Sequence, residues 1–273
     1  MHLNFAFTTV QILWTLTFAA HLVLLVVLMG RDRARRFPWF TTGIALAALR
    51  LISSRLLYGR LPQLTMSEIF IVLADVSSVV ALLVVAEVAR RAFGRVQRRT
   101  LIMWAVALMV LGGLVLGFWG PWPAWKTLTA GSLISTLQLL QLIAQKIGLL
   151  VDVLSIALGV LVLLFGRRYG AGWRSHAQLL IIGLSTASLG QLAVQAIWEI
   201  IAKTAVPHSM AEYERILGLR EKLLNGNNAV YLLVLVWWIV CLWINEPGEK
   251  KEAEAPSAIA KAPAGELPKD AHE

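Results

Sequence analysis

Residues 132–165 read SLISTLQLLQLIAQKIGLLVDVLSIALGVLVLLF, a run of 34 residues in which Lys146 and Asp152 are the only charged side chains. About 20 apolar residues suffice to cross a bilayer as a helix, and a single strand cannot satisfy its backbone in lipid. At a rise of 1.5 Å per residue this helix would be about 50 Å long. The stretch therefore predicts a membrane helix that tilts, breaks or projects beyond the hydrocarbon.

The rest of the chain repeats this pattern. Of 273 residues, 58% are hydrophobic and 15% charged, whereas about a quarter of residues are charged in an average soluble domain. We expect an all-α, polytopic membrane protein with seven transmembrane helices in a domain of residues 1–246. The predicted helices are 8–29, 38–58, 67–89, 99–119, 132–165, 177–203 and 227–245.

The arginines lie on alternate connections between these helices. Twelve arginines follow the first, third and fifth helices: Arg31, Arg33, Arg35, Arg36, Arg90, Arg91, Arg95, Arg98, Arg99, Arg167, Arg168 and Arg174. The connections after the second and fourth helices carry one cation each, Arg60 and Lys126. By the positive-inside rule, the N-terminus lies outside and the C-terminus lies in the cytoplasm.

The net charge of +9 is therefore explained by membrane topology, and nucleic acid is not an expected partner. Residues 247–273 are rich in Ala, Pro, Glu and Lys, and this composition predicts a disordered cytoplasmic tail. The Ala-, Arg- and Leu-rich composition favours a multi-pass protein of a bacterial inner membrane.

A short helix is predicted in the outer connection between the sixth and seventh spans. Ser209 and Glu212 form a capping-box pattern, apolar residues then recur at helical spacing, and Asn225-Gly226 would end the run. Such a helix would lie on the outer leaflet or cover a pocket.

Ionisable residues inside apolar helices need partners, because an unpaired charge in hydrocarbon costs several kcal/mol. Arg50 and Asp75 each lie eight residues from the outer end of their helix, roughly 12 Å deep at 1.5 Å per residue. The two helices are joined by a short turn and should be antiparallel neighbours. The sequence thus predicts an Arg50–Asp75 ion pair.

Polar side chains on four helices face the same outer half of the membrane. The candidate pocket residues are Arg50, Arg55, Asp75, Gln145, Lys146, Asp152, Gln191, Gln195 and Glu199. These groups either bond across helices to fix packing, or line a water-accessible cavity that receives a small polar or anionic ligand from outside. His21, alone at its depth, is interpreted as a packing residue.

Sequence motifs do not assign a reaction. The chain has no His-Glu-x-x-His and no Gly-rich phosphate loop, and residues 230–243 lack the lysine that a retinal Schiff base requires. We expect no enzyme activity and no cofactor. A receptor-like or accessory module acting through a membrane or cytoplasmic protein partner is favoured; a transporter or channel subunit, or a structural subunit of a membrane complex, is the alternative.

Overall fold

A computed structural model describes residues 8–94, 96–119, 122, 133–165, 175–204 and 209–245. All regular secondary structure in these residues is helical. The helices are α1 (Thr9–Gly30), α2 (Arg33–Arg36), α3 (Pro38–Leu57), α4 (Gln63–Ala92), α5 (Arg98–Phe118), α7 (Leu133–Phe165), α8 (His176–Thr204) and α9 (Met210–Trp243). The predicted tail, 247–273, lies outside the described residues.

Local signals in the sequence explain where the first helices begin and end. Thr8 and Gln11 form a reciprocal capping box at the start of α1, each side chain bonding the other residue's backbone N–H at 3.3 Å. Asp32 adopts a left-handed conformation, with φ of 54°, in the turn after α1. Pro38 opens α3, where its missing N–H costs nothing, and Gly59 supplies the positive φ that follows α3.

In the part of the chain that the structure describes, six helices are long and apolar enough to cross a membrane: α1, α3, α4, α7, α8 and α9. The chain is therefore a multi-pass helical membrane protein, as the sequence predicts. The helix expected at 99–119 forms as α5, but its apolar part, Ile102–Phe118, is shorter than those of the other six.

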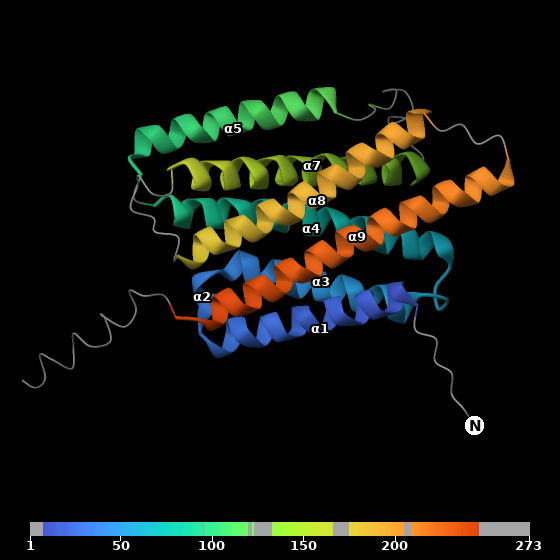
Figure 1. The fold of residues 1–273 in the computed structure, drawn as a ribbon, viewed down its shortest axis with the longest axis horizontal. Helices are drawn as coiled ribbons and strands as arrows, with labels where there is room; N and C mark the ends of the chain where they lie inside the picture. Colours follow the sequence, from blue (N-terminus) through green and yellow to red (C-terminus); the bar gives the residue numbers. More distant parts are fainter. Residues whose placement is uncertain are drawn as a thin grey trace, which may run out of the picture. The chain divides into compact units, whose positions relative to one another are not determined.

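The six long helices form a closed ring. Contacts run from α1 to α3, then to α4, α7, α8 and α9, and α9 packs back against α1; α4 also contacts α8 directly. Helix α5 lies outside this ring beside α7 (Figure 1). Gly112 of α5 allows the close approach, because a Cβ there would collide with the Leu150 side chain of α7.

Successive long helices alternate in direction, so the α1–α3 and α4–α5 connections lie at one end of the bundle (Figure 1). We call this the Arg-rich end; its described arginines are Arg31, Arg33, Arg35, Arg36, Arg90, Arg91 and Arg99. The other is the opposite end. At the Arg-rich end Glu87 of α4 accepts a hydrogen bond from the Phe40 N–H at 3.0 Å and lies 3.8 Å from Arg91. Glu87 thereby caps the first turn of α3, whose N–H groups have no partner within the helix.

The hydrophobic core lies in the half of the bundle next to the Arg-rich end. Leu24, Leu28, Leu180, Leu235 and Leu242 have no exposed surface, and all lie on the parts of their helices nearest that end. Large aliphatic side chains from several helices interdigitate here. This half of the bundle is therefore closely packed.

The predicted short outer helix is wrong as a separate element. Helix α9 runs unbroken from Met210 to Trp243. It includes Asn225-Gly226, where the sequence predicts the end of the short outer helix. Asn227 donates a hydrogen bond to Gln191 of α8 at 2.8 Å, and Gly190 lets the two helices approach closely there. These tertiary contacts offset the low helix propensity of the Asn/Gly segment.

Candidate functional site

A cavity of about 800 Å³ lies inside the six-helix ring. Its lining comes from α1, α3, α4, α7, α8 and α9, and none of the described lining residues belongs to α5. The volume falls in the range of small-molecule sites, which are mostly apolar with a few placed polar groups. We call it the central cavity.

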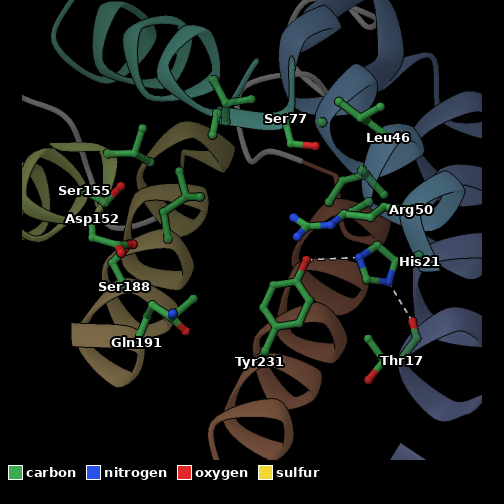
Figure 2. Close-up of a pocket in the computed structure, with 18 of the residues that line it drawn as sticks. Thr17, His21, Leu46, Arg50, Ser77, Asp152, Ser155, Ser188, Gln191 and Tyr231 are labelled. Carbon is green, nitrogen blue, oxygen red and sulfur yellow. Dashed lines mark hydrogen bonds between the residues drawn. The ribbon is translucent and has the colours of Figure 1, made fainter. Parts of the chain in front are cut away.

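One wall of the central cavity carries Arg50 from α3, His21 from α1 and Tyr231 from α9 (Figure 2). We call it the arginine wall. His21 Nδ1 lies 2.7 Å from the Thr17 carbonyl oxygen, and Nε2 lies 3.0 Å from the Tyr231 hydroxyl. A carbonyl only accepts, so Nδ1 carries a proton; in the neutral imidazole Nε2 then accepts from Tyr231. The Tyr231 proton is thus engaged and its oxygen lone pairs remain available.

Arg50 extends from α3 into the central cavity toward the Tyr231 hydroxyl (Figure 2). Among the described residues its guanidinium forms no hydrogen bond or ion pair. Arg50 is exposed although it lies within an apolar helix, and its side chain borders the cavity. A guanidinium carries five N–H donors in a planar fork suited to a carboxylate or phosphate.

The facing wall carries Asp152 and Ser155 from α7 and Ser188 and Gln191 from α8 (Figure 2). We call it the aspartate wall. The Asp152 carboxyl is hydrogen-bonded to the Ser188 side chain. Ser155 is 1% exposed, and its hydroxyl has no hydrogen-bond partner among the described residues. These groups are placed by small residues: a Cβ at Gly159, one turn along α7, would collide with Ser185 of α8.

Apolar side chains close the cavity toward the Arg-rich end. Phe40 and Trp238 meet edge to face there, with ring centroids 5.1 Å apart, and are 2% exposed each. Ile44, Val84 and Val85 surround them. The end of the cavity next to the Arg-rich end is therefore apolar, and we call it the floor. The polar groups lie farther from the Arg-rich end.

Three of the predicted pocket residues line the central cavity: Arg50, Asp152 and Gln191. The other six do not line it: Arg55, Asp75, Gln145, Lys146, Gln195 and Glu199. Lys146 donates to the carbonyls of Leu116 and Trp119 at 3.4 and 2.7 Å, and so holds the end of α5. Arg55 stacks on Trp14 at 5.2 Å, and Glu199 pairs with Lys203 at 2.8 Å.

The predicted Arg50–Asp75 ion pair is wrong. Helices α3 and α4 are neighbours as expected, but Arg50 faces the cavity while Asp75 lies on another face of α4. Ser78, one turn from Asp75, donates to the Ala144 carbonyl of α7 at 3.3 Å, which places this face toward α7. Both Asp75 carboxyl oxygens are buried without a hydrogen-bond partner among the described residues.

Sequence reasoning missed several cavity residues. His21 does bond within the bundle, but it also lines the cavity, as do Tyr231, Asn227 and Asn228. Asn227 and Asn228 open the predicted helix 227–245, but polar side chains at the start of an apolar span were not counted among the pocket residues. Tyr231 had no distinguishing signal, because a tyrosine in a membrane helix is common near either interface.

Among the described residues no group of three or more His, Cys, Asp or Glu side chains is placed to hold a metal ion. The central cavity offers hydrogen-bond donors and acceptors on an apolar background. The chain matches no protein-family model, and neither the curated proteins nor the solved structures give a match.

Proposed function

We propose that the chain is a receptor-like or accessory seven-helix protein of a bacterial inner membrane, which binds a small polar or anionic ligand in the central cavity from the outer side. It has no enzyme activity in this proposal and passes the binding event to a membrane or cytoplasmic protein partner. The unpaired Arg50 guanidinium in the cavity is the observation that carries the proposal.

The seventh crossing in this proposal is α5. Its apolar part, Ile102–Phe118, would extend about 25 Å, close to the hydrocarbon thickness of about 30 Å. Met103, Val106, Val110 and Leu114 are exposed on it, as suits a helix that meets lipid on most of its surface.

The orientation follows from the arginines. Their concentration at the Arg-rich end supports a cytoplasmic position for that end by the positive-inside rule, with the N-terminus outside in this proposal. The polar part of the cavity is then nearer the outer side, and the packed core lies on the cytoplasmic side.

The closed floor favours a blind binding pocket over a conduction path. A transporter or channel subunit needs polar groups that continue toward the cytoplasmic end, whereas Phe40, Trp238 and the leucine core occupy that half. A structural subunit needs no cavity at all. An unpaired guanidinium in such a subunit would destabilise the protein without serving a function.

Cysteine accessibility tests the proposal. Single cysteines at Ser54, Gln191 and Asn228, which line the cavity, are introduced in a Cys241→Ser background, with Leu24→Cys and Leu180→Cys as matched core controls. A membrane-impermeant thiol reagent is added outside intact cells, or to inverted vesicles.

We expect labelling of the cavity cysteines from outside only and none at Leu24 or Leu180. Labelling of the cavity positions from both sides would favour the transporter or channel alternative. Protection of all three cavity positions from both sides would favour the structural subunit and reject a ligand site.

A further inference from the structure

The two walls of the central cavity carry opposite charges that do not meet. Arg50 is the only arginine or lysine, and Asp152 the only acidic residue, among the described residues that line it. The side chains project from opposite sides, α3 for Arg50 and α7 for Asp152, with open space between them (Figure 2). The described residues form no ion pair between the two.

This separation is costly in a membrane protein. Opposite charges attract strongly in a low-dielectric interior, and intramembrane charges pair with one another in most known cases. Here the surrounding contacts hold the two charges apart. Ser188 of α8 forms a hydrogen bond with Asp152 of α7, and the contact between Phe40 and Trp238 fixes α3 against α9. A molecule that spans the gap would pair both charges at once.

The donors and acceptors of each wall differ in kind. The arginine wall offers the guanidinium N–H groups, which select an anion. The aspartate wall offers carboxylate oxygens, which only accept, and beside them the unpartnered Ser155 hydroxyl. An ammonium or hydroxyl group therefore suits the aspartate wall, and a carboxylate or phosphate suits the arginine wall.

Most of the lining of the central cavity is apolar. Ile44, Leu46, Ala47, Val151 and Leu184 are among the apolar side chains that line it. A hydrocarbon body would bury itself here with a gain of about 25 cal/mol for each Å² removed from water. A small polar ion would leave this surface unfilled.

We propose that the ligand is a dipolar amphiphile, whose anionic group is bound by Arg50, whose ammonium or hydroxyl group is bound by Asp152, and whose apolar body lies between the two walls. The inference rests on the proposed ligand-binding function and narrows the ligand to this chemical class.

The test uses probes that differ only in their end groups. The purified protein in micelles of an uncharged maltoside detergent is titrated calorimetrically with amino acids bearing the amine at the far end of the chain: aminohexanoic, aminooctanoic and aminododecanoic acid. The carboxylic acid and the amine of each chain length serve as single-group probes, and protein-free micelles correct for partitioning into detergent.

We expect one chain length of the amino acid to bind at least about tenfold more tightly than either single-group probe, because each charge-assisted bond adds to the affinity. Asp152→Asn should reduce this probe to the affinity of the acid, and Arg50→Gln should reduce it to that of the amine. Matched controls are Asp75→Asn and Arg55→Gln, which alter charges outside the cavity and should leave the affinities unchanged.

If the unchanged protein bound the carboxylic acid as tightly as the amino acid of the same chain length, the proposal of a dipolar ligand would be overturned. The central cavity would then be a site for an anion alone. Failure of every amino acid to exceed its single-group probes would overturn it as well. Neither result affects the proposed pocket itself, which the cysteine labelling decides independently.

Discussion

The two halves of the helix bundle are built differently from similar helices. Next to the Arg-rich end, leucine, valine and aromatic side chains pack with little or no exposed surface, and Glu87 caps α3. Toward the opposite end the same helices separate around a cavity lined by Arg50, Asp152 and Tyr231. Lipid surrounds both halves, so burial from water does not distinguish them; close packing and hydrogen bonding do. A dense base that positions a loosely filled site is the arrangement that the proposed binding function requires.

The two halves should differ most in the free energy of unfolding that is lost when a leucine is truncated to alanine. Leu235→Ala, in the packed half, should lower the free energy of unfolding by about 2–5 kcal/mol, because a cavity replaces a side chain with no exposed surface. Leu51→Ala, on the cavity wall, should cost less than half as much. Both are measured by reversible denaturation in mixed micelles. Equal losses would show that the two halves are equally well packed.

A smaller difference is expected for two glycines in long helices. A Cβ at Gly183 of α8 would collide with the Trp238 ring, so Gly183→Ala should destabilise by about 1–3 kcal/mol through overpacking. Gly148 of α7 has no heavy atom within 4 Å of the corresponding position, and Gly148→Ala should stabilise by up to about 1 kcal/mol through helix propensity. Thermal unfolding of the two variants side by side gives the sign. A tolerated alanine at position 183 would mean that α8 and α9 are less closely packed than described.

The smallest effect concerns two acidic residues. Glu87→Gln should cost about 1–2 kcal/mol, because the 7% exposed carboxylate bonds the first turn of α3 and faces Arg91. Glu199→Gln breaks a pair with Lys203 in which both side chains are exposed, and should cost less than about 0.5 kcal/mol. The same denaturation assay measures both. If Glu199→Gln lowered the free energy of unfolding more than Glu87→Gln does, the cap that Glu87 provides at the Arg-rich end would not be the more stabilising of the two interactions.

The helices were largely predictable from the sequence, because length and apolar content in a membrane leave few alternatives to a helix. The helix end predicted at Asn225-Gly226 is wrong, because the contact of Asn227 with Gln191 outweighs the local turn signal. Asp152 and Gln191 were predicted as pocket residues because polar side chains recur on one face of their helices, and both line the cavity, whereas Gln145 and Gln195 of the same faces do not.

The sequence alone determined that the chain crosses a membrane, which end carries the arginines, and which helices bear buried polar groups. These follow from transfer free energies of single segments, which do not depend on neighbours. Only the tertiary structure decided that Arg50 and Asp75 face different ways, that Lys146 holds α5, and that His21 and Tyr231 share a wall. The rotation of a helix about its axis is set by packing against all its neighbours, and depth along one helix carries no information about that angle.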